Sequence, residues 1–140
     1  MKTLVITRGC PGSGKSTFIK DNLPNATVCS ADKFFSLSGS YKYDASMIGE
    51  AHKYCMREFL SSVATRQDLI VIDNTNIRVM DYIAYVRVAE ALGYKAYQKV
   101  MSGNFQNVHG VPDSKVAKMK KDFQEDKFLE HLPDTFFKKD

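Results

Sequence analysis

The sequence predicts an α/β fold in which a parallel sheet of about four strands is covered by helices on both faces. Short apolar runs recur along the chain, and segments with apolar side chains at three- and four-residue spacing lie between them. Glycine- and asparagine-rich turns separate the two kinds of segment. Because strands that alternate with helices need crossover connections, the strands of such a sheet run parallel to one another.

The first half of the chain contributes two strands and two helices to this prediction. Residues 2–8 hold a compact apolar run typical of a buried strand, and residues 26–30 form a second, shorter strand. Residues 15–23 form a helix that ends before Pro24. Residues 44–66 form a long helix whose core-facing side chains are Ile48, Ala51, Cys55, Phe59 and Val63.

The second half repeats the alternation. Residues 69–73 are the clearest strand, fully apolar until the final acid, and residues 95–101 form a fourth strand. Between them lies a helix that ends near Gly93, with a core face of Val79, Tyr82, Ile83, Val86 and Ala89. Residues 102–110 are expected to form a loop, followed by a helix that begins at Pro112 and continues through Val116, Met119 and Phe123.

The length of the chain predicts a single domain of residues 1–140, and the C-terminal tail is expected to dock on it. The tail of residues 125–140 has no assigned secondary structure. Its apolar side chains are expected to dock on the domain, and they are Phe128, Leu129, Leu132, Phe136 and Phe137.

Composition and charge narrow the class of protein. The formal net charge of +4 is a mild basic excess that favours an anionic ligand without requiring nucleic acid. Acids interleave the lysines of residues 115–127, which favours a solvated helix face there. The three cysteines lack zinc-binding spacing, and the chain has no apolar run long enough for a signal peptide or a membrane span. We therefore expect a soluble cytoplasmic protein with reduced thiols and no membrane partner.

A phosphate-binding loop is the strongest motif in the sequence. Residues 9–16 read GCPGSGKS and fit GxxxxGK[ST] between a buried strand and a helix start. The glycines let successive N–H groups point inward at phosphate, Lys15 reaches the β- and γ-phosphates, and the Ser16 hydroxyl binds Mg²⁺. A glycine-rich turn without a ligand is the alternative, which the flanking segments disfavour. The expected nucleotide-binding set is Gly9, Gly12, Ser13, Gly14, Lys15, Ser16 and Thr17.

Two acids follow predicted strands at the carboxyl edge of the sheet, where α/β folds bind ligands. Asp73 can hold Mg²⁺ or its water, or it can cap the turn of residues 73–76. Asp32 can accept a proton from a hydroxyl that attacks the γ-phosphoryl group, and helix capping is its competing role. Asn74 and Arg78 lie close behind Asp73 as candidate substrate contacts, although asparagine-rich turns are commonly only turns.

Five ordered markers carry a resemblance to a known family. They are GCPGSGKST at 9–17, SADKFF at 30–35, EAH at 50–52, DNTN at 73–76 and HGVP at 109–112. Together they resemble the P-loop kinases related to phage polynucleotide 5′-hydroxyl kinase and the ATPase domain of NEDD4-binding protein 2 relatives.

The resemblance implies a three-layer P-loop NTPase fold with strand order 2-3-1-4, ATP and Mg²⁺ as ligands, and a nucleic-acid 5′ end as partner. It implies that Lys15 and Asp32 are catalytic, with Asp32 deprotonating a 5′-hydroxyl. Asp73 or Asn74 matches the family's polar pair beside the acceptor, so the resemblance leaves the metal contact open between them.

The chain departs from the family pattern at two positions. Phe35 stands where the phage kinase has an arginine near the acceptor strand, and Gln106 stands where the lid has an arginine. Lost lid charge weakens stabilisation of the transferring phosphoryl group, and Lys115, His109 or Arg78 are the candidates to replace it.

The leading hypothesis is therefore a phosphotransferase that acts on a polynucleotide 5′-hydroxyl. The alternatives are a kinase of a small nucleoside-like substrate and a nucleotide-binding module with little turnover. On the long helix, His52 is either a surface histidine or a catalytic one. Arg57 contacts either an acceptor phosphate or a helix neighbour.

Overall fold

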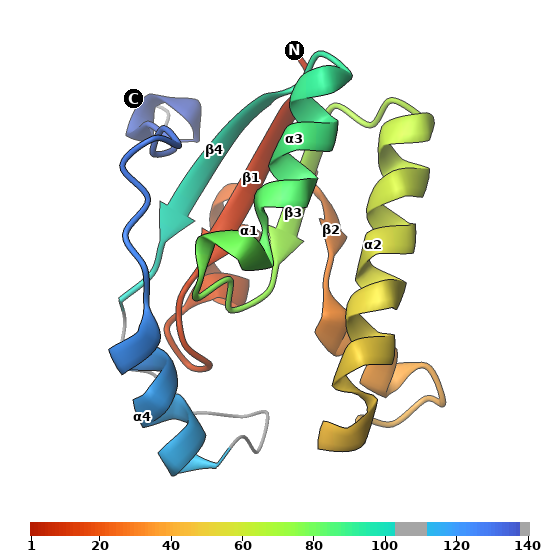
Figure 1. Cartoon of the computed structure of the whole chain (residues 1–140). Coiled ribbons are helices and arrows are strands. Elements are labelled where there is room, and N and C mark those ends of the chain that lie inside the picture. The colour runs from red at the N-terminus through yellow and green to blue at the C-terminus, as the bar shows by residue number, and fades with distance from the viewer. Residues whose placement is uncertain (103–111, 138–140) are drawn as a thin grey trace.

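The computed structural model describes residues 1–102 and 112–137 and confirms the predicted α/β fold. Within these residues, four parallel strands form a sheet in the order β2-β3-β1-β4, as Figure 1 shows. The strands are β1 (Thr3–Arg8), β2 (Thr27–Cys29), β3 (Leu69–Asp73) and β4 (Lys95–Val100). The pairing register places Thr7 of β1 beside Asp73 of β3, so the first strand and the strand-end acid reach the same edge.

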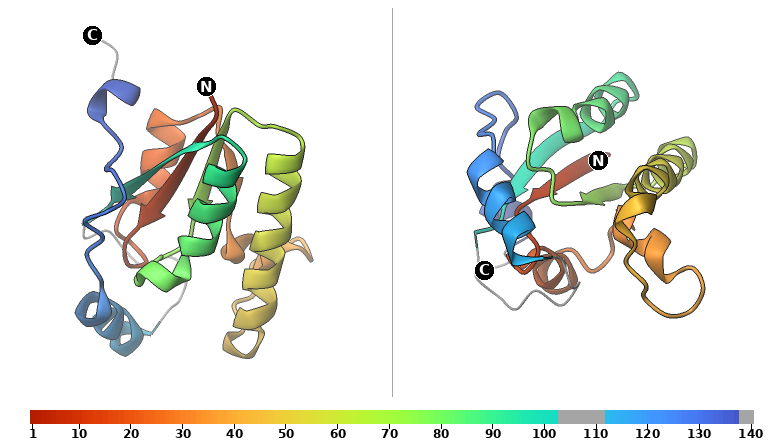
Figure 2. Two further views of the ribbon diagram at one scale, coloured as in Figure 1. Left: turned by 45° about the horizontal axis from the view of Figure 1, so that its top comes forward. Right: turned by 60° about the horizontal axis from the view of Figure 1, so that its bottom comes forward.

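Helices cover both faces of the sheet (Figure 2). The helix α1 (Lys15–Asn22) lies on one face, and α2 (Ile48–Ala64) and α3 (Ile83–Ala91) lie on the other. Because side chains alternate along a strand, Leu4 and Ile6 pack with α2 and α3 whereas Val5 packs with α1. Each face of the sheet therefore has its own apolar core, and side chains on both faces of β1 are buried.

The core faces of both helices were predicted closely, apart from one position of the second. Short 3₁₀ turns precede both helices, η2 (Ala45–Met47) before α2 and η3 (Val79–Asp81) before α3. Tyr82, Val86 and Ala89 are buried as predicted, and Val79 packs against the core. Ile83 is only partly buried, whereas Tyr85 is buried with its ring centroid 5.0 Å from that of Phe59.

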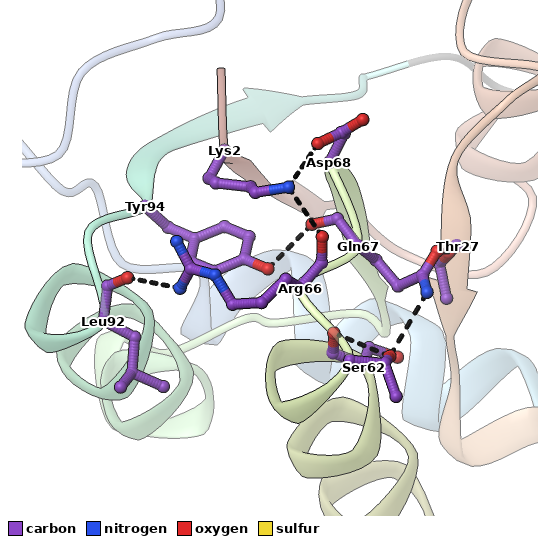
Figure 3. Close-up of polar contacts among 9 residues, drawn as sticks. Lys2, Thr27, Ser62, Arg66, Gln67, Asp68, Leu92 and Tyr94 are labelled. Carbon is purple, nitrogen blue, oxygen red and sulfur yellow. Dashed lines mark hydrogen bonds and ion pairs between the residues drawn. The ribbon is translucent and has the colours of Figure 1, made fainter.

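A polar network closes the amino edge of the sheet (Figure 3). The Tyr94 hydroxyl donates to the Gln67 carbonyl at 2.7 Å, and the Arg66 guanidinium donates to the Leu92 carbonyl at 2.6 Å. Lys2 Nζ donates to the Arg66 carbonyl at 2.7 Å and pairs with Asp68. These bonds join the connections that lead into β3 and β4. The phosphate-binding loop and Asp73 lie at the opposite, carboxyl edge, which is therefore the edge for a ligand site.

The tail docks along β4, as predicted, after the helix α4 (Asp113–Asp122). The Gln98 N–H donates to the Glu130 carbonyl and the Leu132 N–H donates to the Gln98 carbonyl, both at 2.8 Å. Leu132 is buried, and the other docked apolar side chains are Leu129, Phe136 and Phe137. The expectation for Phe128 was wrong, because its side chain is fully exposed. A short 3₁₀ helix, η4 (Asp134–Phe136), lies in this tail.

The predicted loop at 102–110 lies, apart from Ser102, outside the described residues, as do Gln106 and His109. All three cysteines are buried and form no disulfide. Among the described residues, none of the helices combines the length and the apolar character that crossing a bilayer requires.

Candidate active site

The loop between β1 and α1 has a backbone that only glycine accommodates easily. Gly12 and Gly14 adopt φ angles of 80° and 102°, in the left-handed region that other residues rarely adopt. A Cβ atom at Gly9 would stand 2.5 Å from Ser13 Oγ and 2.6 Å from the Met101 carbonyl oxygen. The glycines of the motif therefore permit the tight path of the loop at the start of α1.

Two side chains of this loop fit a phosphate ligand. Ser13 is 3% exposed, and its buried hydroxyl has no hydrogen-bond partner within the described structure. Lys15 Nζ donates to the carbonyls of Gly9 and Cys10 at 2.7 and 3.0 Å, so the ammonium group lies over the loop. Burial lowers the pKa of Lys15, and the carboxylate of Asp73 opposes that shift. An anion bound in the loop would give partners to both groups.

The Asp73 carboxylate points toward the phosphate-binding loop. It accepts hydrogen bonds from the hydroxyls of Thr7 at 2.9 Å and Ser16 at 3.5 Å. Burial raises the pKa of Asp73, while the Thr7 hydrogen bond and the Lys15 charge oppose the rise. A hydroxyl and a carboxylate next to a triphosphate are the oxygen ligands that Mg²⁺ prefers, so these residues fit the predicted metal site.

The turn after β3 is held by Asn76 rather than by Asp73. Asn76 is 2% exposed and adopts a positive φ of 48°. Its amide nitrogen donates to the carbonyls of Thr7 at 2.7 Å and Ile72 at 3.2 Å. The Gly9 N–H donates to the Thr75 carbonyl at 2.9 Å, so the turn and the phosphate-binding loop support each other. The Asp73 carboxylate bonds to Thr7 and Ser16 instead, so it has contacts beyond capping this turn.

Asp32 lies in the 3₁₀ helix η1 (Ala31–Ser36), directly after β2. The cap of this helix is Ser30, whose hydroxyl accepts from the Asp32 N–H at 3.1 Å. The Asp32 carboxylate instead accepts a hydrogen bond from the Tyr41 hydroxyl at 2.6 Å. Capping therefore does not account for the Asp32 side chain, and Tyr41 is a contact that the sequence did not indicate.

Asn74 fixes the position of Asp32 relative to Asp73. Its side-chain oxygen accepts from the Ala31 N–H at 2.9 Å, and its amide nitrogen approaches Cys55 Sγ at 3.5 Å. The charges of Asp32 and Asp73 both act on Lys15, and Asp32 also acts on Asp73. The three charged groups therefore form one electrostatic cluster at the carboxyl edge of the sheet.

The two predicted arginine contacts lie elsewhere. Arg57 is exposed, two residues from Cys55 and hence on the opposite side of α2 from the core. The Arg78 guanidinium forms an ion pair with Asp122 of α4 at 3.2 Å. Lys115, a candidate to replace lid charge, donates to the Tyr43 hydroxyl at 3.1 Å. The structure thus assigns Arg78 and Lys115 to contacts between α4 and the rest of the domain.

Arg8 is a buried residue that sequence reasoning missed. Its side chain is fully buried at the end of β1, immediately before the phosphate-binding loop. The guanidinium donates to the Asn76 carbonyl at 2.9 Å, to Gln98 Oε1 at 3.0 Å, and to the Ile77 and Gln124 carbonyls. The only sequence signal for this role was the position of a charged residue at the end of an apolar strand.

A protein-family model described as an AAA domain matches residues 4–102, which include β1 apart from its first residue, the phosphate-binding loop, Asp32 and the turn after β3. The chain belongs to this AAA domain family.

Individual proteins resemble the chain in sequence or in fold. Human NEDD4-binding protein 2 is 31% identical over 134 residues, which cover 86% of this chain and 8% of that protein. A chain of the Pnkp1/Rnl/Hen1 RNA repair complex gives a TM-score of 0.57 at 22% identity, over 91% of this chain and 40% of that one. The APS kinase CysC of Mycobacterium tuberculosis gives a TM-score of 0.50 at 14% identity, over 86% and 96%.

Proposed function

We propose that this protein is a Mg²⁺-dependent phosphotransferase that moves the γ-phosphoryl group of ATP to the 5′-hydroxyl of a polynucleotide. The observation that carries the proposal is that Lys15, Asp73 and Asp32 lie at the carboxyl edge of the sheet, where Asp73 accepts from Ser16 and Asn74 binds the backbone beside Asp32. A site that only bound nucleotide would need the first two. Asp32 adds a carboxylate that can accept the proton of an acceptor hydroxyl.

Each residue has a defined task in this proposal. The loop amides, Ser13 and Lys15 hold the phosphates, and Ser16 with Asp73 holds Mg²⁺. Bound ATP supplies the phosphoryl group. Asp32 accepts the proton of the attacking hydroxyl, and the Tyr41 hydroxyl holds the carboxylate in place for that transfer.

The polynucleotide acceptor is supported by the ordered sequence markers and by one structural likeness. A structurally similar chain belongs to an RNA repair complex. The buried, unbridged cysteines support a further proposal, that the protein works in a reducing compartment such as the cytoplasm.

A small nucleoside-like acceptor is the second candidate, and Phe35 favours it. Phe35 is 7% exposed, and its ring packs against Tyr43 at 5.2 Å and Tyr41 at 6.2 Å between centroids. A buried aromatic cannot contact the phosphates of an acceptor strand as an arginine would. The position therefore provides packing for the loop that carries Tyr41 rather than charge.

Transfer of label from γ-labelled ATP to a 5′-hydroxyl oligonucleotide and to free nucleosides tests the proposal. We expect Lys15→Ala to lose both ATP binding and transfer. Asp32→Asn should keep ATP binding and slow transfer by about 10²–10⁴-fold. The matched controls Lys20→Ala and Asp21→Asn change exposed residues of α1 and should behave as the wild type.

Two results would contradict the proposal. Wild-type protein that binds Mg²⁺ and ATP but labels no acceptor would show a nucleotide-binding module. Asp32→Asn that transfers at the wild-type rate would remove Asp32 as the base.

A further inference from the structure

A cavity lies beside the active site, between the N-terminal halves of α2 and α3. Its volume is about 490 Å³, within the usual range for small-molecule sites. His52 and Met56 of α2 line one side, Met80 and Asp81 of η3 line the other, and Asn74 lies at the turn after β3. Two of the sequence markers, EAH and DNTN, thus meet in one cavity, although phosphate binding uses neither His52 nor Asn74.

The chemistry of the walls suits a flat, polar, uncharged ring. Met56 and Met80 offer polarizable apolar surface, and thioethers make favourable contacts with aromatic rings. His52 and Asp81 offer hydrogen-bonding groups around that surface. Burial lowers the pKa of His52 and the Asp81 charge opposes the shift, so the neutral imidazole presents one donor and one acceptor.

The charges around the cavity disfavour a phosphate ligand. Lys53 at the wall forms an ion pair with Glu50 at 3.2 Å, and Asp81 adds a negative charge. An anion would bind better in the phosphate-binding loop, where backbone N–H groups and Lys15 meet.

We propose that this cavity holds the nucleoside ring of the phosphate acceptor, an inference that rests on the proposed function. The link between the two sites is Asn74, which lines the cavity and also accepts the hydrogen bond from Ala31, the neighbour of Asp32. An acceptor with its hydroxyl at Asp32 extends past Asn74, and its base enters between Met56 and Met80. The base edge then faces His52 and Asp81, which read it by hydrogen bonds.

Methyl NMR tests the binding step without relying on catalysis. Protein with ¹³C-methyl methionine is saturated with Mg²⁺ and a non-hydrolysable ATP analogue, so that the phosphate-binding loop is occupied. It is then titrated with adenosine, with thymidine and with a 5′-hydroxyl trinucleotide. We expect the Met56 and Met80 methyl signals to shift, and that of Met47, an exposed methionine of η2 outside the cavity, to stay. Saturation by the mononucleosides identifies a nucleoside as the source of the ring, and saturation by the trinucleotide alone identifies a strand end.

Kinetics of two variants test the role in transfer. His52→Ala and Met80→Ser should each raise the acceptor KM about tenfold, with the KM for ATP and kcat unchanged. The matched controls are His131→Ala and Met47→Ser, both exposed and outside the cavity.

The outcomes separate the cavity from the proposed function. Methyl shifts at Met56 and Met80 without transfer to any acceptor would retain the cavity as a nucleoside site and overturn the kinase proposal. Transfer by His52→Ala and Met80→Ser with wild-type acceptor KM would overturn the cavity and retain the kinase. An absence of methyl shifts with every ligand at millimolar concentration, or shifts at Met47 equal to those at Met80, would also overturn it.

Discussion

Replacing Arg8 by methionine tests whether one buried guanidinium holds the active-site loops together. The side chain is fully buried and donates four hydrogen bonds, to the carbonyls of Asn76, Ile77 and Gln124 and to the Gln98 amide oxygen. Its guanidinium carbon also lies 4.8 Å from the Tyr82 ring centroid and 4.5 Å from that of Phe123. Methionine keeps most of the volume and removes every donor.

The expected loss of stability follows from these contacts. Leaving a buried acceptor unsatisfied costs about 1–3 kcal/mol, and carbonyl oxygens, which have two lone pairs, fall at the low end. Part of the loss is offset because burial disfavours the charged guanidinium, which lowers the pKa of Arg8. We therefore expect a net loss of about 3–5 kcal/mol, a large share of the roughly 5–15 kcal/mol that stabilises a typical domain.

Urea unfolding followed by circular dichroism measures this difference. With a typical slope of about 2 kcal/mol per molar urea, the midpoint should fall by roughly 2 M. The matched control is Arg87→Met on the exposed face of α3, where the ion pair with Glu90 is worth about 0.5 kcal/mol or less. A midpoint for Arg8→Met within about 0.5 M of the wild type would refute the reasoning, because the four acceptors would then not depend on the guanidinium.

Three further substitutions and one control have defined outcomes. Tyr41→Phe removes the donor to Asp32 and should slow phosphoryl transfer about tenfold in a steady-state assay, with ATP affinity unchanged. Burial raises the pKa of Asp73, so its ionised form destabilises the fold as pH rises above the ordinary aspartate value. Asp73→Asn should therefore raise the melting temperature of the nucleotide-free protein at about pH 7, with the gain vanishing at strongly acidic pH, and calorimetry should show no Mg²⁺-dependent gain in ATP affinity. Gly9→Ala should cost about 1–3 kcal/mol in urea unfolding, because the new Cβ meets a backbone oxygen at 2.6 Å. Gly49→Ala, where a Cβ meets nothing within 4 Å, should instead stabilise α2 by about 0.5–1 kcal/mol.

Each of these predictions has an opposing result. Equal transfer rates for the wild type and Tyr41→Phe would show that the hydroxyl does not position Asp32. A lower melting temperature for Asp73→Asn across the whole pH range would mean that the carboxylate stabilises the fold. Equal unfolding midpoints for Gly9→Ala and the wild type would show that the loop relaxes around the added carbon.

Much of the fold could be predicted because its signals are local. The apolar runs of β1 and β3 are buried on both faces, so they read as continuous hydrophobic segments. The spacing of the glycines, Lys15 and Ser16 reflects a backbone path that this short segment determines by itself. The order of the strands came from the resemblance, and the structure confirms it.

The missed features depend on contacts between distant segments. Asn76 looked like one member of an asparagine-rich turn, and Thr7, whose carbonyl accepts its shortest hydrogen bond, becomes a neighbour only once β1 and β3 pair. From spacing alone, Asp32 was equally able to cap the helix after β2 or to accept a proton, and the structure gives the cap to Ser30. In α3, Tyr85 is buried and Ile83 only partly so, because spacing places both positions at the margins of the same core face.

The position of Gln98 gives the first half of the tail an influence on the distant active site. The Gln98 backbone donates to Glu130 and accepts from Leu132. Its side-chain amide donates to the carbonyls of Asp126 and Leu129 at 2.7 Å, and its side-chain oxygen accepts a bond from Arg8. Loosening the tail therefore frees the glutamine amide to rotate, and the guanidinium beneath it loses an acceptor. A proteolytic nick near residue 130 would accordingly weaken nucleotide binding from the far side of β4, without altering any residue of the loop that holds the phosphates.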